Sequence, residues 1–183
     1  GPRKLACGCI LRDDVGVKDE RRHNRLVKII RNMGIRTERL YQAVTDVDRA
    51  DFVPAGLPAG AIYHDAPIQI GEGQTTSQPS LVAQMVDALG LSPEDTALEI
   101  GTGYGYQTAL LASICARVVS IEQSPELAQH ARTNLAEYGF GNVDVITGDG
   151  TAGAPGEAPF NGIVVSAAAP EVPAALTEQL AEE

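Results

Sequence analysis

The chain has 183 residues, of which 44% are hydrophobic, and a formal net charge of −10. This length is sufficient for one well-buried domain with a small additional element. The acidic balance argues against nucleic-acid binders, whose basic clusters hold phosphates, so we expect no nucleic-acid partner. The sequence shows no apolar run as long as a membrane span and no recognisable signal peptide, so we expect no membrane contact and a cytoplasmic location.

The cysteines and histidines indicate neither a disulfide framework nor a metal site. Cys7, Cys9 and Cys115 do not form an even set, which favours a reducing compartment. The three histidines are scattered along the chain without the spacing of metal ligands, so we expect no metal ion. We also predict a monomer.

The first part of the chain predicts a tail followed by two helices. Residues 1–20 show no clear period and are expected to form a flexible tail. Apolar residues then recur at helical spacing from Arg21, and Gly34 predicts the end of that helix. A second helix is expected to start at Thr37. The apolar positions expected in the two helices are Leu26, Ile29, Ile30 and Met33, and then Leu40, Ala43, Val44 and Val47.

The segment 52–79 is rich in proline, glycine and threonine and predicts a long irregular stretch. Loops of this length inside a compact domain are usually functional. We therefore expect this segment to contribute to a site.

The remainder alternates between strands and helices, which predicts an α/β fold with a Rossmann-like, doubly wound and mostly parallel sheet, preceded by an N-terminal helical element. Ligands in such sheets bind at the carboxyl ends of the strands. We divide the chain into the tail 1–20, the N-terminal helices and active-site loop 21–90, and the cofactor-binding α/β domain 91–183. The expected elements are a helix at 81–89, strands at 96–100 and 117–122, helices at 107–115 and 125–138, strands at 143–147 and 162–166, and a helix from about Glu171.

The most informative motif follows the first of these strands and reads Gly101-Thr102-Gly103-Tyr104-Gly105. A dinucleotide site has the spacing Gly-x-Gly-x-x-Gly, whereas the third glycine comes one position earlier here. The motif resembles the first motif of S-adenosylmethionine methyltransferases. Glu99, just before the turn, would repel a pyrophosphate but suits the amino group and sulfonium charge of that cofactor. The alternative is a tight strand-to-helix turn without a ligand.

Glu122 strengthens the cofactor interpretation. It lies seventeen residues after Gly105, at the end of the next predicted strand. A carboxylate at this place can accept hydrogen bonds from both ribose hydroxyls of an adenosine.

Four other segments carry a family pattern: Asp51-Phe52-Val53-Pro54, residues 68–79, Gly148-Asp149-Gly150-Thr151 and residues 167–173. Together with the glycine loop they resemble the protein-L-isoaspartate O-methyltransferase family, from about Arg21 to the end of the chain. The glycine loop is shared by many methyltransferases. The combination of residues 68–79 with residues 167–173 is strongly specific.

The resemblance implies transfer of a methyl group from S-adenosylmethionine to the free α-carboxylate of an L-isoaspartyl residue in a protein or peptide. S-adenosylhomocysteine is the implied product. The ester then closes to a succinimide, whose hydrolysis returns part of the material to aspartate, so the implied role is repair. A carboxylate is already ionised at neutral pH, so the protein has to supply an in-line approach and a dry pocket rather than a general base.

The resemblance also implies which residues form the site. Ser77 matches the active-site serine, whose hydroxyl orients the acceptor oxygen; alternatively it caps the helix that contains Pro79. Asp149 and Gly150 match the positions that receive the adenine. The expected cofactor contacts are Gln74, Thr75, Thr76, Ser77, Glu99, Gly101, Thr102, Gly103, Gly105, Gln107, Glu122, Gln123, Asp149 and Gly150, and the expected substrate contacts are Ser77, Ala167, Ala168 and Pro170.

Two of these expectations keep an alternative. The small residues between Ser166 and Pro170 either leave room for a peptide backbone or simply begin the next helix. Tyr104 either packs on the methionine part of the cofactor or fills the core, and we favour the core.

The chain also departs from the family pattern. Family members continue beyond Glu183 with further strands, so the C-terminal strands of the sheet are expected to be missing. Thr76 stands where isoleucine is usual and Ser80 where a bulky aromatic residue is common, which predicts a more polar and open mouth of the site. Two alternative functions therefore stay open: a dedicated aspartyl O-methyltransferase that modifies one biosynthetic peptide, and a noncatalytic module that binds the cofactor or a protein.

Overall fold

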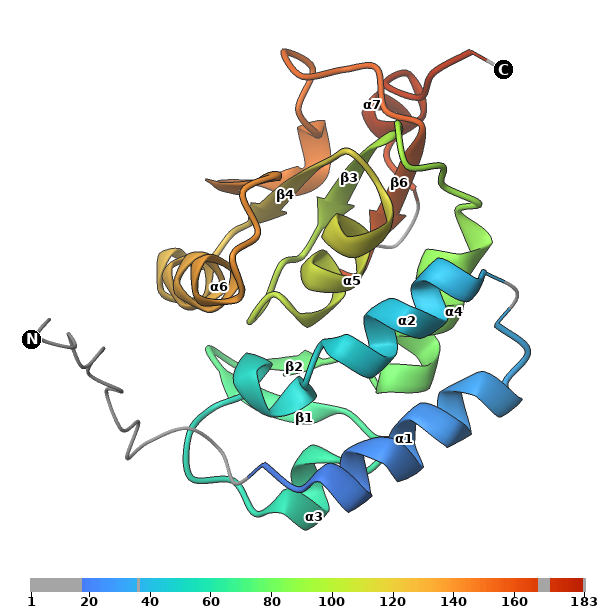
Figure 1. The fold of residues 1–183 in the computed structure, drawn as a ribbon. Coiled ribbons are helices and arrows are strands. Elements are labelled where there is room, and N and C mark those ends of the chain that lie inside the picture. The colour runs from blue at the N-terminus through green and yellow to red at the C-terminus, as the bar shows by residue number, and fades with distance from the viewer. Residues whose placement is uncertain (1–17, 36, 168–171, 183) are drawn as a thin grey trace, which may run out of the picture.

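The computed structural model describes residues 18–35, 37–167 and 172–182 (Figure 1). Ala168, Pro170 and the residues 1–17 of the predicted tail lie outside this part. The N-terminal half contains α1 (Glu20–Asn32), α2 (Glu38–Asp46), a 3₁₀ turn η1 (Arg49–Phe52), α3 (Ala59–Ile62), β1 (Ile68–Gly71), β2 (Gln74–Thr76) and α4 (Pro79–Ala88). The second half contains β3 (Thr96–Ile100), α5 (Tyr106–Ile114), β4 (Arg117–Glu122), α6 (Pro125–Tyr138), β5 (Val143–Thr147), a 3₁₀ turn η2 (Gly150–Ala152), β6 (Gly162–Val165) and α7 (Ala174–Thr177).

The second half forms a parallel sheet with the strand order β5-β4-β3-β6, so the predicted α/β fold is confirmed. Successive residues of β3 face opposite sides: Ala97 belongs to the larger core under the N-terminal helices, and Leu98 to a smaller core on the other face. Both residues are completely buried, as expected for a strand covered on both faces. The strands predicted at 96–100, 117–122 and 143–147 and the helix at 125–138 have the predicted bounds.

The segment 52–79 is more regular than predicted. It contains α3 and an antiparallel hairpin in which β1 pairs with β2. Ile68 and Ile70 alternate inward around Gln69, and the connection from Gly71 to Gly73 has positive φ angles. The high content of glycine and threonine thus reflects a tight hairpin turn and a short strand rather than an irregular loop.

Two residues of the apolar helical pattern are exposed instead of buried. Met33, 47% exposed, caps the end of α1 and lies beyond its last turn. Leu81, 44% exposed, lies in the first turn of α4 on the side away from the core. Among the described helices, none has the length and apolar character needed to cross a bilayer.

The N-terminal helices pack on the α/β unit through α2, which contacts α5 and α4 (Figure 1). The predicted inward residues of α2 are buried, and Leu40, Ala43 and Val44 are each at most 3% exposed. Thr37 precedes this helix as its N-cap, as predicted, although its side chain makes no capping hydrogen bond. The two halves of the described chain therefore share one main hydrophobic core.

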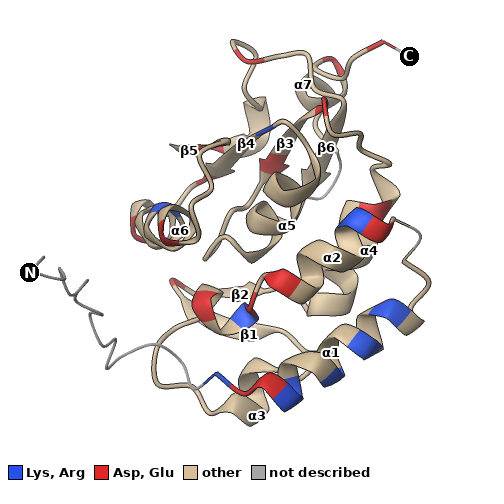
Figure 2. Cartoon of the chain, in the orientation of Figure 1, with Lys and Arg blue, Asp and Glu red and all other residues tan. Residues whose placement is uncertain are grey.

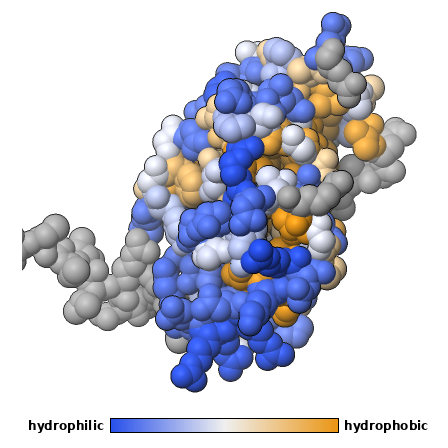
Figure 3. Space-filling view, turned by 45° about the vertical axis from the view of Figure 1, so that its right-hand side comes forward, coloured by the Kyte–Doolittle hydropathy of each residue, from blue (hydrophilic) through white to orange (hydrophobic). Residues whose placement is uncertain are grey.

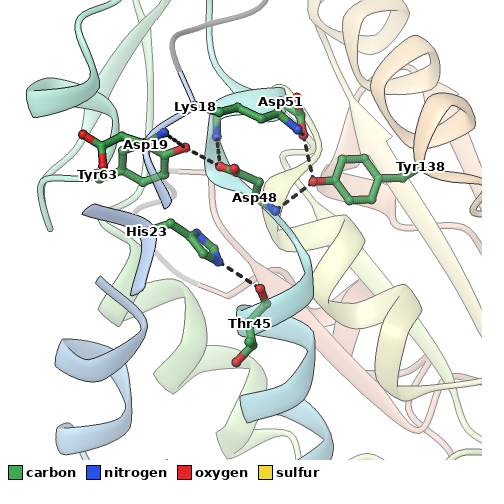
Figure 4. Close-up of polar contacts among 9 residues, drawn as sticks. Lys18, Asp19, His23, Thr45, Asp48, Asp51, Tyr63 and Tyr138 are labelled. Atoms are coloured by element: carbon green, nitrogen blue, oxygen red, sulfur yellow. Dashed lines mark hydrogen bonds and ion pairs between the residues drawn. The ribbon is translucent and has the colours of Figure 1, made fainter. Parts of the chain in front are cut away.

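A polar cluster fastens η1 to both α6 and the start of the N-terminal helices (Figure 4). The Tyr138 hydroxyl donates to Asp51 Oδ2 over 2.8 Å and accepts from the Asp48 backbone N–H over 2.8 Å. The Tyr63 hydroxyl donates to Asp48 Oδ1 over 2.8 Å, and Lys18 forms an ion pair with Asp51 Oδ2 at 2.7 Å. Phe52 is the last residue of η1 and lines the cavity described below, so this cluster positions one wall of that cavity.

A second polar cluster lies inside the α/β unit around the Glu99 carboxylate. Glu99 is completely buried. Its Oε2 accepts hydrogen bonds from the hydroxyls of Thr108 and Ser120, and its Oε1 accepts from Gln107 Nε2 over 3.0 Å. Ser120 is in turn 2.5 Å from the Thr102 hydroxyl. The Glu99 carboxylate of β3 is thus hydrogen-bonded to β4 and to the start of α5. Through Ser120 it is also linked to Thr102 in the glycine loop that connects β3 to α5.

We predict that Tyr138→Phe lowers the free energy of unfolding by about 1–3 kcal/mol, since it leaves the partly buried Asp48 N–H without an acceptor while the ring remains. Urea unfolding monitored by circular dichroism measures this. Tyr41→Phe is the matched control, because no hydrogen bond of the Tyr41 hydroxyl is found within the described residues. Equal losses in the two variants would contradict the role of the cluster.

We further predict that burial of Glu99 makes stability depend on pH. Burial raises the pKa of Glu99 from 4.5 to about 7, although its three hydrogen bonds lower it. The folded protein therefore holds a proton that the unfolded chain releases above about pH 4.5, and this stabilisation is lost as the pH rises through 7. Relative to Glu99→Gln, the unmodified protein should lose up to about 3 kcal/mol of stability between pH 5 and pH 8.

Urea unfolding at a series of pH values measures this difference, because other titrating groups are common to both proteins. Glu94→Gln, at an exposed position, is the control and should show no such difference. Parallel pH profiles for the unmodified protein and Glu99→Gln would contradict the prediction.

Candidate active site

A cavity of about 450 Å³ lies at the carboxyl edge of the sheet, between the glycine loop and the β1–β2 hairpin. Its walls come from both halves of the described chain. Of the residues predicted to contact cofactor or substrate, those that line it are Gln74, Thr75, Thr76, Ser77, Gly101, Thr102, Gly103, Gln107, Glu122, Gln123, Asp149, Gly150 and Ala167. Parallel strands bring their carboxyl ends to one edge, which is why residues so far apart in sequence meet here.

Two predicted cofactor residues do not reach the cavity wall. Gly105 has a φ of 94° and is the N-cap of α5, and a Cβ atom there would lie 3.4 Å from the Leu135 side chain. The turn conformation and the close packing against α6 therefore explain why position 105 is a glycine. Glu99 lies behind the wall in its buried cluster, so the direct contact with the cofactor expected for it is not supported.

Gln107 occupies the place between Glu99 and the cavity. Its Nε2 donates to Glu99 Oε1 and to Ser166 Oγ, the latter over 2.7 Å. Its Oε1 is buried and has no hydrogen-bond partner within the described residues. Unsatisfied buried acceptors are rare, and Gln107 lines the cavity, so this oxygen is suited to a donor group on a bound ligand.

Glu122 ends β4 and is held by two backbone donors. Its Oε2 accepts from the Gly103 N–H over 2.9 Å, and its Oε1 accepts from the Ser124 N–H over 3.0 Å. The residue is only 5% exposed, and it lines the cavity. An ionised carboxylate has about four acceptor positions, so each oxygen retains capacity for a further donor such as a ribose hydroxyl.

The hairpin side of the cavity carries Thr76 and Ser77, both half-buried. The residue that caps α4 is Gln78, and its side chain makes no capping hydrogen bond. Ser77 is therefore not the cap of this helix. Of the two roles considered for Ser77, the one at the cavity remains. Ser80 does not widen the mouth as predicted: it is completely buried, and its backbone N–H donates to Asp65 Oδ1 over 2.9 Å.

Asp149 and Gly150, the residues predicted to receive the adenine, line the cavity. Backbone and side-chain hydrogen bonds from Thr151 hold the pKa of the exposed Asp149 below its usual value. A Cβ atom on Gly150 would lie 2.5 Å from the Ile100 side chain, so the strand end and this turn can approach closely only with glycine here. Tyr104 packs against the core, as we favoured, but it also lines the cavity and stacks on His130 with ring centroids 4.8 Å apart.

The aromatic residues that line the cavity and the buried arginine behind its hairpin wall were not identified from the sequence. Phe52 and Tyr106 line the cavity from η1 and α5. Phe52 could have been found, because it belongs to a segment that carries the family pattern. Arg49, one turn earlier, is 1% exposed and has no motif that marks it.

Charge is distributed unevenly over the molecule. Within the described chain, basic residues gather along α1, and acidic residues are spread over the other elements (Figure 2). The face shown in Figure 3 is hydrophilic over its lower part, and hydrophobic residues gather higher up. Among the described residues that line the cavity, Glu122 and Asp149 are the charged ones, and both are acidic.

Comparison with known proteins identifies the family. The family model for protein-L-isoaspartate(D-aspartate) O-methyltransferase matches residues 21–183. A protein-L-isoaspartate O-methyltransferase of Methanoculleus marisnigri is 51% identical over 151 residues, which cover 82% of this chain and 68% of that protein. One of Myxococcus xanthus is 50% identical over 147 residues, covering 80% of this chain and 69% of that protein.

Solved structures agree with this assignment. A protein-L-isoaspartate O-methyltransferase superposes with a TM-score of 0.81 at 30% identity over 87% of this chain, and this chain spans 52% of that one. A protein of Plasmodium falciparum, described as a putative protein-L-isoaspartate O-methyltransferase and solved with S-adenosyl-L-homocysteine, has the same fold, with a TM-score of 0.71 at 24% identity over 87% of this chain and 80% of that one. The family match, the shared identity and the fold together show that the chain belongs to the protein-L-isoaspartate O-methyltransferase family.

Proposed function

We propose that the protein containing this chain transfers the methyl group of S-adenosylmethionine to the α-carboxylate of L-isoaspartyl residues in proteins or peptides, as the first step of repair through a succinimide. The observation that carries this proposal is that one cavity joins the glycine loop and Glu122 to the hairpin segment with Ser77. The relatives named for this activity share about half of their residues with this chain over most of its length.

For the cofactor, we assign the ribose to Glu122 and the adenine to the turn at Asp149 and Gly150. The methionine part then lies along the glycine loop, where the free Gln107 Oε1 can accept from its ammonium group. Glu99 contributes by fixing the Gln107 amide rather than by touching the ligand. The cofactor supplies a methyl group on a positively charged sulfur.

The residues of the chain then have to position the acceptor rather than activate it. The carboxylate oxygen forms a bond to the methyl carbon, the carbon–sulfur bond breaks, and its electron pair stays on sulfur. The ionised acceptor needs no base, so alignment at near-attack distance is the main contribution of the protein. We assign Ser77 the role of orienting the acceptor oxygen and Ala167 a place beside the peptide backbone.

The two predicted parts of the chain have complementary roles in this proposal. Residues 21–90 supply the acceptor side through the hairpin, and residues 91–183 supply the cofactor side through the sheet edge. We further propose that the protein acts as a monomer in the cytoplasm. The buried thiol of Cys115 is compatible with a reducing compartment, since burial raises its pKa to about 11 and suppresses thiolate chemistry.

The decisive experiment is transfer of labelled methyl groups to matched peptides that contain isoaspartate or aspartate at one position, with the full-length protein. We expect transfer to the isoaspartyl peptide and little to the aspartyl peptide. Transfer restricted to a single aspartyl peptide would support a dedicated tailoring enzyme instead. Cofactor binding without transfer to any peptide would support a noncatalytic module.

Ser77→Ala tests the acceptor side in the same assay. Loss of one hydrogen bond to a charged oxygen should lower the transfer rate by about 10-fold or more and leave cofactor affinity unchanged. Ser113→Ala is the matched control, because its hydroxyl donates to the Ala109 carbonyl within α5 and Ser113 does not line the cavity. An unchanged rate in Ser77→Ala would remove the orienting role from Ser77.

Glu122→Gln tests the cofactor side. The neutral amide loses charge-assisted acceptance from the ribose hydroxyls and has one acceptor oxygen instead of two, so affinity for S-adenosylhomocysteine should fall by about 10- to 100-fold. Isothermal titration calorimetry measures the dissociation constant. The control is Glu126→Gln, an exposed acid in the first turn of α6, which should leave this constant unchanged. Equal affinities in Glu122→Gln and the unmodified protein would contradict the assignment.

A further inference from the structure

The proposed acceptor is an anion, yet the described wall of the cavity carries no lysine or arginine. Its charged lining residues are Glu122 and Asp149, which repel a carboxylate. Beyond position 40 the sequence contains no lysine and only three arginines, namely Arg49, Arg117 and Arg132. Arg117 is paired with Asp144 and Glu157, and Arg132 binds the β5 backbone, so both are used elsewhere.

Arg49 is the cation directly behind the hairpin wall. It is 1% exposed, and its guanidinium forms no ion pair within the described residues. Nη1 donates to the carbonyls of Ile62 and His64 over 2.9 and 2.8 Å. Nη2 donates to the carbonyl of Ala66 over 2.8 Å and to Thr76 Oγ1 over 3.1 Å. Burial lowers the pKa of Arg49 only to about 10, so the group is charged at neutral pH.

The Thr76 hydroxyl connects this buried charge to the cavity. Its oxygen accepts from Arg49 Nη2 and also from the Ile68 backbone N–H over 3.3 Å. A hydroxyl oxygen has two acceptor positions and one hydrogen to donate. With both acceptor positions occupied, the hydrogen of Thr76 is directed away from both donors, and no protein acceptor for it is found in the described chain. Thr76 lines the cavity next to Ser77.

We propose that the Thr76 hydroxyl, polarised by Arg49, is a pre-oriented hydrogen-bond donor that binds a carboxylate in the cavity. Arg49 is then a positioning residue, which acts through Thr76 and does not touch the ligand. This inference rests on the proposed function, which supplies two carboxylates: that of the isoaspartyl acceptor and that of the methionine part of the cofactor. The place of Thr76 beside Ser77 favours the acceptor.

Thr76→Val tests the donor, because it replaces the hydroxyl by a methyl group at nearly constant shape. We expect the KM for an isoaspartyl peptide to rise by about 10-fold or more with kcat changed less than about twofold, since a charge-assisted hydrogen bond is lost. Thr76→Ser restores the hydroxyl and should stay close to the unmodified protein. Thr133→Val, in α6 and away from the cavity, is the control for loss of a threonine hydroxyl.

Calorimetry separates the two possible carboxylates. Weaker binding of the isoaspartyl peptide to the protein loaded with S-adenosylhomocysteine, but unchanged binding of its carboxamide analogue, supports the acceptor as the ligand. Weaker binding of S-adenosylhomocysteine, but unchanged binding of 5′-methylthioadenosine, which lacks the amino-acid end, supports the cofactor carboxylate. Unchanged affinities for all four probes in Thr76→Val would overturn the proposal, as would equal losses in Thr76→Val and Thr76→Ser.

The role of Arg49 is tested by combining Arg49→Lys with Thr76→Val. Lysine keeps the charge but not the planar fork, so we expect a higher KM in the Arg49→Lys single variant. In the double variant we expect a KM close to that of Thr76→Val alone. Additive increases would show that Arg49 does not act through Thr76. Calorimetry measures peptide binding without methyl transfer, so it tests this inference separately from the proposed function. A protein that binds the carboxylate through Thr76 but transfers no methyl group would support this inference and overturn the proposed function.

Discussion

The buried carboxylate of Glu99 is the interaction on which the rest of the site depends. It is an acid near the end of β3 with no exposed surface, and its oxygens accept hydrogen bonds from three side chains of α5 and β4. Placing a charge there is costly, which is why the surrounding hydrogen bonds are so complete. The same contacts fix where α5 begins and how the glycine loop leaves β3. The position of the loop therefore follows from a carboxyl group that lies behind the cavity wall.

Both halves of the described chain contribute to the cavity, and each half is held by buried polar groups. The sheet edge is organised by Glu99, with Gln107 between it and the cavity. The hairpin is organised by Arg49, whose guanidinium ties the segment 62–66 to β2. Tyr138 then links η1 to α6. A buried carboxyl group and a buried guanidinium thus support opposite walls of one cavity.

Sequence patterns were sufficient for the sheet but not for its supports. Residues 96–100 and 117–122 are apolar runs bounded by turn residues, so their strand character is local and could be predicted. The spacing of the glycines and the place of Glu122 after a strand are also local features, so the cofactor side of the cavity could be predicted from them. Arg49 could not be recognised, because a lone arginine in a polar segment is normally on the surface. The burial of Glu99 could not be predicted either, because it depends on the hydrogen bonds that Gln107, Thr108 and Ser120 donate to it once the chain has folded.

Two expectations failed because composition was used in place of geometry. The hairpin at 68–76 contains glycine and threonine, which indicated a loop, yet Ile68 and Gln69 pair with Thr76 and Thr75, and Ile68 and Ile70 are both buried. Ser80 was expected to open the mouth of the site because it stands where a bulky aromatic residue is common in the family. In the structure the Gln78 side chain donates to its hydroxyl and the residue is covered. A small residue next to a motif says little about exposure until the direction of its helix is known.

The charge pattern of the cavity has a consequence for turnover. The acids Glu122 and Asp149 favour a positively charged cofactor, and the cation Arg49 favours a negatively charged acceptor. In the proposed reaction the sulfonium becomes a neutral thioether and the carboxylate becomes a neutral ester. Both products are therefore less complementary to the cavity than the substrates from which they form. The chemical step of the proposed reaction thus lowers the electrostatic attraction on each side, which favours dissociation of both products.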